Sequence, residues 1–225
     1  MVGKPRGSEA RTKKKSIRKR NPEKTKQAIL SAATVEFCKH GLKGARVDAI
    51  ASRSKSNIRL MYQYFGNKTD IYRAVLEQVY IHIRTEERNL KLSSHEPVDA
   101  MRRLIDFTFT FFGSHHSYVT LINNENMLQA QFASKSAIIR SLTLPLVSTI
   151  KKLLARGQRI GVFRKDVDPI QLYTSITALS YFHISNRFTL SAMFNKDLNR
   201  EAWLEERKIH ARDVILTWLT DTAAK

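Results

Sequence analysis

Apolar side chains recur along the chain mainly at spacings of three and four residues, the pattern of helices that bury one face. After Pro22, for example, Ile29, Ala32, Ala33 and Phe37 fall on one helical face. No segment shows the sustained two-residue alternation that is typical of strands. We therefore predict an all-α chain, with helices over about these ranges: 22–41, 47–53, 58–65, 68–90, 97–112, 116–132, 135–157, 169–193 and 199–222.

Residues with known preferences for helix ends support several of these limits. Gly41 is suited to a left-handed cap after the first helix, and Asn57 and Asn67 are suited to begin the third and fourth helices. Asp168 followed by Pro169 is typical of a helix start. Pro145 falls inside a predicted helix, where we expect it to kink the helix or to mark a junction between two segments.

The charge of the chain points to a polyanionic partner. It holds 39 Lys and Arg against 20 Asp and Glu, which gives a formal net charge of +19 and a pI near 10.3. Residues 1–68 carry 18 of the basic and 4 of the acidic residues. This excess favours nucleic acid first and an anionic membrane surface second.

Residues 1–21 have almost no large apolar side chains, so we predict a disordered basic arm there, which either solubilises the protein or contacts phosphates.

Several protein classes are disfavoured. The single cysteine, Cys38, excludes an internal disulfide framework and a multi-cysteine zinc site, and it fits a reducing, cytoplasmic location. The apolar runs are too short to span a membrane, so we expect no membrane partner. No phosphate-binding glycine loop or nucleophile motif is present, and the seven histidines form no convincing metal spacing. We therefore expect no catalytic residues, no metal, no cofactor and no enzymatic activity.

Two short predicted helices joined by a tight turn, at about residues 46–65, have the arrangement of a helix-turn-helix. The first helix would bury Ile50 and Ala51, so that the second could lie in the DNA major groove. A plain helical hairpin with core aromatics is the alternative. The candidate DNA-binding residues are Arg46, Val47, Lys55, Asn57, Arg59, Tyr62, Gln63, Tyr64 and Lys68.

The expected roles of these residues follow from their chemistry. Arg59 can bind guanine and Gln63 can bind adenine, each through two hydrogen bonds in the major groove. Tyr62 can reach base edges or phosphates from the same face. Asn57, Tyr64 and Lys68 lie at the ends of the helix, where contacts to the DNA backbone are expected.

Three groups of residues resemble the TetR family of bacterial transcriptional regulators. They are Thr25-x-x-Ala28-Ile29-Leu30-x-Ala32-Ala33 with Phe37 and Gly41, Val47-x-x-Ile50-Ala51, and Tyr62-x-Tyr64-Phe65-x-x-Lys68. Arg156-Gly157, Gly161-Val162-Phe163-Arg164 and Asp166-Val167-Asp168-Pro169 are similar to the segment that leads into the dimerisation helices of that family. The resemblance implies a DNA-binding domain over residues 22–82 and a larger effector-binding and dimerisation domain over residues 83–225.

The chain departs from the family pattern in the turn and at the start of the helix that precedes it. The family commonly has Ala-Gly-Val-Ser in the turn, whereas this chain has Ser54-Lys55-Ser56-Asn57. If Lys55 adopts the left-handed conformation of the usual glycine, the cost is roughly 1 kcal/mol. Arg46 replaces a hydroxyl residue that often caps the next helix, which makes it a candidate phosphate contact.

Polar and aromatic side chains within the later helices suggest an effector pocket, because ligand sites combine apolar walls with a few convergent polar groups. Core packing, helix capping or a dimer interface are the alternatives for each of them. Arg187 favours a carboxylate or another small anionic or aromatic metabolite as the effector. The candidate effector-binding residues are Phe109, Phe112, Asn123, Asn126, Gln129, Tyr181, His183, Asn186 and Arg187.

The last two predicted helices carry apolar side chains that either close the core of the monomer or pack against a second copy: Leu172, Ile176, Leu179, Phe182, Trp203, Ile215, Trp218 and Leu219. We expect a homodimer that binds double-stranded DNA at a near-palindromic operator and is released as a repressor by a small-molecule effector. A protein that coats nucleic acid without sequence preference, and an enzyme or carrier that uses the helical body, are the alternatives.

Overall fold

The computed structural model describes residues 21–222, and every regular element among them is a helix. The predicted arm at residues 1–21 lies outside this range, except for Asn21. The first four helices are α1 (Pro22–Gly44), α2 (Val47–Ser54), α3 (Ile58–Phe65) and α4 (Lys68–Asn89). The all-α fold class and the existence of these four helices are confirmed.

Capping residues account for the limits of these helices. The Asn21 side chain accepts hydrogen bonds from the backbone N–H groups of Glu23 and Lys24 at the start of α1. At the start of α4, Asn67 accepts from the N–H of Asp70, whose carboxylate in turn accepts from the N–H of Asn67. Gly41 interrupts α1 one turn before its end, with a φ of 62° and a ψ of −179°. The predicted positive φ is therefore confirmed, but the backbone is not in the left-handed helical conformation of the predicted cap.

Up to residue 222, the rest of the described chain forms six further α-helices and two short 3-10 helices. They are η1 (Leu92–Ser94), α5 (Pro97–Ser114), α6 (His116–Met127), η2 (Ala133–Lys135), α7 (Ala137–Arg159), α8 (Pro169–Ser185), α9 (Arg187–Phe194) and α10 (Glu201–Thr220). As predicted, Asp168 caps α8 by accepting from the Gln171 N–H at 2.7 Å. Pro145 lies within α7, which continues through it, so of the two expected outcomes, a kink or a junction, the junction is wrong.

Two predicted helices extend too far. The helix predicted to reach residue 132 ends at Met127, where Gln129 and Ala130 take positive φ values of 56° and 55°. The buried Glu125 carboxylate accepts the N–H groups of Phe132 and Ala133, which holds the chain in this reversal. The helix predicted over 169–193 is two helices, α8 and α9. They separate at Asn186, whose φ of −108° and ψ of 14° lie outside the helical range. Its backbone N–H and its side-chain amide both donate to the carbonyl of Phe182.

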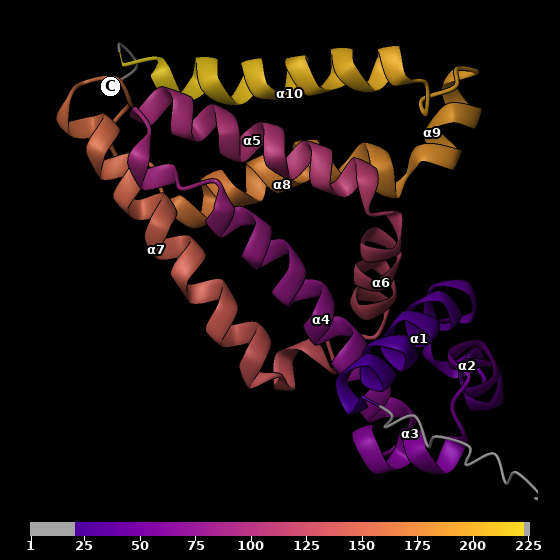
Figure 1. The fold of residues 1–225 in the computed structure, drawn as a ribbon. Coiled ribbons are helices and arrows are strands. Elements are labelled where there is room, and N and C mark those ends of the chain that lie inside the picture. Colours follow the sequence, from indigo (N-terminus) through magenta and orange to yellow (C-terminus); the bar gives the residue numbers. More distant parts are fainter. Residues whose placement is uncertain (1–20, 223–225) are drawn as a thin grey trace, which may run out of the picture.

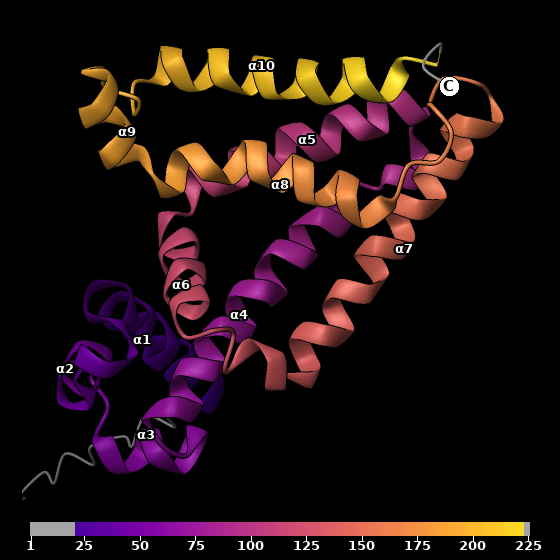
Figure 2. The ribbon, with the colours of Figure 1, turned by 180° about the vertical axis from the view of Figure 1, so that it is seen from behind.

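The helices are arranged as a body with a smaller bundle at one end (Figure 1). Helices α5, α8 and α10 contact one another and run side by side, while α4 and α7 extend from them toward the bundle of α1, α2 and α3. The reverse view shows the same arrangement, with α6 between α1 and the body (Figure 2). Helix α4 therefore belongs to both parts, since Tyr72 and Val75 pack in the core of the bundle and Ile83 packs with Phe112 and Ile184 in the body.

Each part has its own buried core. In the bundle, the ring of Phe37 on α1 meets the edge of Tyr72 on α4 at 5.1 Å between centroids, and Ile50 and Met61 bring α2 and α3 onto the same core. In the body, Leu104, Ile150, Ile176 and Leu219 join α5, α7, α8 and α10. The bundle is thus a rigid support for the exposed faces of α2 and α3.

Helix α6 joins the two parts through polar contacts as well. The Cys38 thiol on α1 donates to the Ser117 carbonyl at 3.4 Å, and the Asn124 amide donates to the Phe37 carbonyl at 3.3 Å. Burial raises the pKa of Cys38 to about 11, so this thiol remains protonated at neutral pH.

Candidate functional site

Helices α2 and α3 form a helix-turn-helix whose outer face is open to solvent. Ile50, Ala51 and Met61 are buried against α1 and α4, which fixes both helices on the bundle. On the opposite face of α3, Arg59 and Gln63 are exposed one turn apart, and neither side chain is engaged by another group within residues 21–222. The geometry therefore leaves free the two side chains best suited to read base edges.

In the turn between the helices, Lys55 adopts the left-handed conformation of the glycine that is usual in the family, so the condition for its cost is met. Its φ and ψ angles are 53° and 34°, and its N–H is bonded to the carbonyls of Ala51 and Ser52. The Ser56 N–H also returns to the Ala51 carbonyl, at 3.0 Å. These bonds hold a non-glycine residue in a conformation that glycine adopts more readily.

This turn offers a test that separates stability from DNA binding. Replacing Lys55 with glycine relieves the backbone strain, so we expect the free energy of unfolding to rise by about 1 kcal/mol. The same change removes an exposed cation, so DNA affinity should fall and its salt dependence should become shallower. Urea unfolding and DNA titration at several salt concentrations check both effects. Lys55→Ala is the control that loses the charge but keeps the strain, and equal stability of the two variants would contradict the strain.

The start of α2 is supported by a residue on α1 that the sequence patterns did not single out. Arg46 provides no side-chain cap; instead its backbone N–H donates to the Glu36 carboxylate at 3.0 Å. Glu36 is charged but buried, because it lies among the apolar positions of α1. A carboxylate on the apolar face of a helix was the available signal, because such a group needs a hydrogen-bond donor nearby.

The Arg46 side chain is exposed but already paired. Its guanidinium donates two hydrogen bonds to the Asp48 carboxylate, at 3.2 and 2.7 Å. These hydrogen bonds, together with the Coulombic attraction of Arg46, outweigh partial desolvation and hold the pKa of Asp48 below its ordinary value. If Arg46 contacts a DNA phosphate, its guanidinium therefore interacts with the phosphate and with Asp48 at the same time.

The ends of α3 are also fixed. Asn57 accepts from the Leu60 N–H at 2.7 Å, as its predicted capping role requires, and Tyr64 is half-buried edge-on to the Phe65 ring. Lys68 donates to the carbonyl of Lys43 at 3.1 Å and so ties the start of α4 to the end of α1. Of the remaining predicted contacts, Tyr62 is exposed and Val47 is partly buried.

The structure brings five of the nine predicted effector residues together where α5, α6 and α8 meet. The Tyr181 hydroxyl donates to the Asn123 side-chain oxygen at 2.6 Å, and its ring meets the edge of Phe112. Phe109 and His183 are stacked, with 4.7 Å between ring centroids. These five side chains therefore form two groups of direct contacts in one region of the body.

The other four predicted effector residues lie apart from this region. Asn126 and Gln129 are exposed at the end of α6. Asn186 and Arg187 both donate to α8 carbonyls, those of Phe182 and Ile184. The Arg187 guanidinium also lies 4.5 Å from the centroid of the Phe188 ring.

His183 makes the stability of the body dependent on pH. Burial, and secondarily the positive charge of Arg207, lower its pKa from 6.5 to about 4, so the unfolded chain binds this proton more readily than the folded chain. Stability from this group is complete above pH 7 and decreases as the pH falls toward 4. We expect a loss of about 2 kcal/mol between pH 7 and pH 5. Urea unfolding of wild type and His183→Phe at fixed protein concentration measures it, and an equal loss in both proteins would contradict it.

A cavity of about 460 Å³ lies elsewhere in the body, between α4, η1 and α7. Its apolar wall consists of Leu92, Leu142, Pro145, Leu146 and Leu153, and none of the nine predicted effector residues lines it. Its volume is in the range of small-molecule sites in proteins. The sequence patterns did not indicate this cavity because it forms between helices that are about 50 residues apart in the chain.

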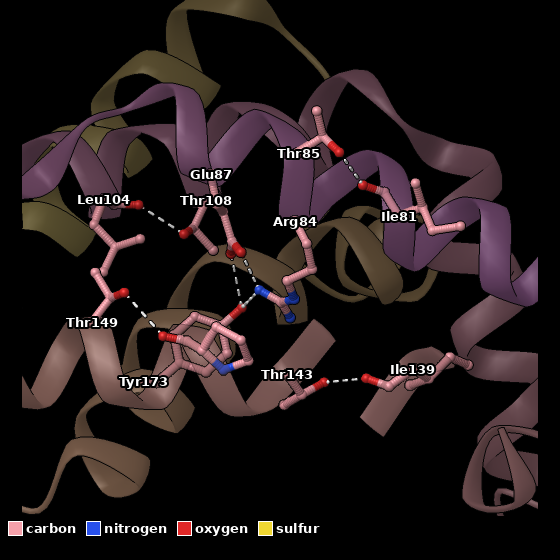
Figure 3. A network of polar contacts seen from close by, with 11 residues as sticks. Ile81, Arg84, Thr85, Glu87, Leu104, Thr108, Ile139, Thr143, Thr149 and Tyr173 are labelled. Atoms are coloured by element: carbon pink, nitrogen blue, oxygen red, sulfur yellow. Dashed lines mark hydrogen bonds and ion pairs between the residues drawn. The ribbon is translucent and has the colours of Figure 1, made fainter. Parts of the chain in front are cut away.

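Beside this cavity, a buried polar network joins α4 to α8 (Figure 3). Arg84 forms an ion pair with Glu87 on the same helix, and it also donates to the Tyr173 hydroxyl at 3.1 Å. The Tyr173 hydroxyl donates in turn to the second oxygen of Glu87, at 3.3 Å. Burial, partly offset by Arg84, raises the pKa of Glu87 above its ordinary value.

Residues 21–222 contain no group of three or more His, Cys, Asp or Glu side chains that could hold a metal ion. Within the same range, no helix is long and apolar enough to cross a membrane.

Comparison with known proteins agrees with both parts of the fold. Residues 29–75 match the family described as bacterial regulatory proteins, tetR family, and residues 97–215 match the tetracyclin repressor-like C-terminal domain. The HTH-type transcriptional repressor NicS of Pseudomonas putida is 35% identical over 187 residues, which cover 83% of this chain and 88% of NicS. The repressor SCO4008 of Streptomyces coelicolor is 36% identical over 110 residues, or 48% of this chain and 53% of that protein.

Solved structures show the same fold at lower sequence identity. The putative transcriptional regulator SCO4942 of Streptomyces coelicolor is 22% identical, with a TM-score of 0.66 over 87% of this chain and 98% of its own. The ketosteroid regulator KstR2 of Mycobacterium tuberculosis is 18% identical, with a TM-score of 0.63 over 87% of this chain and 95% of its own.

An exposed helix-turn-helix on a separate helical body defines a DNA-binding regulator of transcription. The matches over both parts of the chain make the assignment specific. The chain belongs to the TetR family of bacterial transcriptional regulators.

Proposed function

We propose that this protein is a homodimeric repressor that binds a near-palindromic operator and leaves it when a small molecule binds its helical body. The exposed face of α3, with Arg59 and Gln63 free above a buried Met61, carries the proposal. The name of NicS as a transcriptional repressor favours repression over activation. Since the partner is the bacterial chromosome, we place the protein in the cytoplasm.

The proposed DNA contacts are the residues expected from the sequence. Arg59, Gln63 and Tyr62 reach the bases, whereas Val47, Lys55, Asn57, Tyr64 and Lys68 line the contact to the DNA backbone. Arg46 contributes as a shared cation, because Asp48 already pairs with it.

The outer face of α8 and α10 supports the proposed dimer. Leu172, Ile176, Ile215 and Leu219 close the core of the chain itself, so they are not available to a partner. On α8, however, Ile170 and Phe182 are 60% and 57% exposed, and Trp218 on α10 is 47% exposed. Large apolar side chains exposed on two adjacent helices are typical of a protein interface.

The effector is proposed to bind within the body, either in the cavity between α4 and α7 or among the predicted residues around Tyr181. The cavity is favoured because it is open space lined by both apolar and polar groups. A ligand there would act on DNA binding if it prefers one arrangement of α4, which carries the helix-turn-helix bundle at its other end.

Two experiments test this function. Selection of bound sequences from a random DNA pool should yield a near-palindromic site, whereas recovery without sequence preference would favour a protein that coats nucleic acid. Sedimentation should show a dimer at micromolar concentration, and Phe182→Glu should shift it to monomer and weaken operator binding by more than about tenfold. A wild-type monomer would overturn the dimer and the palindrome together.

A further inference from the structure

The cavity between α4 and α7 is strongly cationic. It is lined by five cations, which are Arg84, Arg88, Lys91, Lys152 and Arg156, and by a single carboxylate, Glu87. Arg84 is buried, whereas Arg88, Lys91 and Lys152 are exposed. Unbalanced charge of one sign along a cleft attracts a ligand of the opposite sign.

The one carboxylate is fully occupied by other groups. One oxygen of Glu87 accepts from Arg84 and the other accepts from the Tyr173 hydroxyl. Its side chain is 5% exposed, and it lies beside the guanidinium that it neutralises. Glu87 therefore cannot balance the four other cations of the cavity.

Several of the cations keep unused hydrogen-bonding capacity. The Arg84 side chain is only 8% exposed, and its buried Nε–H has no hydrogen-bond acceptor among residues 21–222. In the same part of the chain, the ammonium groups of Lys91 and Lys152 form no ion pair or hydrogen bond. Arg156 differs, because it donates to the backbone carbonyls of Leu92 and His95 and so holds η1 against α7.

A buried N–H without an acceptor is costly, and a bound anion would satisfy it. The rest of the wall is apolar, with Leu92, Leu146 and Leu153 buried around the space. An inorganic ion would leave that apolar surface and most of the volume unfilled. The chemistry therefore matches an anionic group joined to an apolar body.

We propose that this cavity binds a small organic carboxylate, whose carboxylate group contacts Arg84, Lys91 and Lys152 while its apolar part packs on the leucine wall. The proposal rests on the proposed ligand-responsive function, which it deepens by assigning the chemical class of the ligand.

Calorimetric titration of the full chain with benzoate and hexanoate, each compared with its amide and with inorganic phosphate, tests the proposal. We expect the carboxylates to bind in a way that weakens with added salt, and to exceed the neutral amides and phosphate by about tenfold or more. Amides or phosphate that bind as well as the carboxylates would overturn it, as would the absence of carboxylate binding at about 10 mM, a concentration that detects even weak sites.

Adjacent lysines on α7 provide a matched pair of variants. Lys152 lines the cavity, whereas Lys151 is exposed and does not. Lys152→Gln should weaken benzoate binding about tenfold, and Lys151→Gln should leave it unchanged. Equal weakening by the two would show attraction by net charge alone and would overturn the site. Lys152 is exposed, so this test does not depend on whether a variant of the buried Arg84 folds.

These titrations contain no DNA, so they are decided separately from the proposed regulatory function. Carboxylate binding without any effect on a selected operator would overturn the regulatory function and leave the site intact. A selected operator without carboxylate binding would do the reverse.

Discussion

Replacing Arg59 with alanine is expected to remove most of the preference for the operator at one base pair of each half-site. Arg59 is exposed on α3, is free of intramolecular partners within residues 21–222, and is able to bind guanine through two hydrogen bonds. Loss of these two hydrogen bonds lowers the discrimination between the correct and the wrong base by about 1–3 kcal/mol, or roughly 5- to 150-fold in relative affinity. Gln63→Ala should act in the same way at a neighbouring position that carries adenine.

The matched variant is Lys68→Ala, which should weaken operator and random DNA alike, because a phosphate contact carries no sequence information. Its bond to the Lys43 carbonyl also holds α4, so its folding has to be checked by thermal unfolding. Lys151→Ala, on α7, controls for net charge. Titration of each variant with selected and random DNA gives the ratio of the two affinities. Equal losses of affinity on both DNAs for the Arg59, Gln63 and Lys68 variants would contradict the assigned roles.

Replacing Gly157 with alanine is expected to destabilise the body by about 3 kcal/mol. A Cβ at this position of α7 would lie 2.0 Å from a ring carbon of Phe163, which is itself 2% exposed. Contacts this close force a shift of buried groups. The Val162 N–H also bonds to the Gly157 carbonyl at 2.9 Å, which ties the loop tightly to the helix and limits relaxation.

Gly113 provides the control for this substitution. It is also helical, in α5, but a Cβ added there would have no neighbouring group within 4 Å, so Gly113→Ala should be neutral or stabilise by up to about 1 kcal/mol. Urea unfolding at fixed protein concentration compares the two variants. In a Phe163→Ala background the cost of Gly157→Ala should fall well below its value in the wild type, and an unchanged cost would exclude the ring as its cause.

The helix-turn-helix was predictable from sequence because its signals are local. Asn57 and Asn67 mark helix starts, and the buried positions Ile50 and Ala51 fix which face of α2 is exposed. The burial of Met61, which sets the inner face of α3, was not predicted. The split between α8 and α9 was not predictable, since the apolar pattern continues through Asn186 and the break is seen only in the backbone angles of that residue, a φ of −108° and a ψ of 14°.

The cavity was hidden for a different physical reason. Arg84 and Lys152 are 68 positions apart, and on its own helix each resembles an ordinary solvated cation. Only the packing of α4 beside α7 shows that Arg84 is buried while Lys152 borders the same space. Likewise, Glu36 gains its role at the start of α2 from a contact across ten residues of chain.

The protonated thiol between α1 and α6 has a practical consequence for spectroscopy. Alkylating reagents react with the thiolate, and with a pKa of about 11 fewer than about one in a thousand Cys38 side chains carry it at pH 7.5. Cys38 is also the only cysteine of the chain. A cysteine introduced at Met127, which is 84% exposed, can therefore take a fluorophore or spin label selectively, without a cysteine-free background. Distances between such labels in the two subunits would report directly on how far apart the DNA-binding ends of a dimer lie.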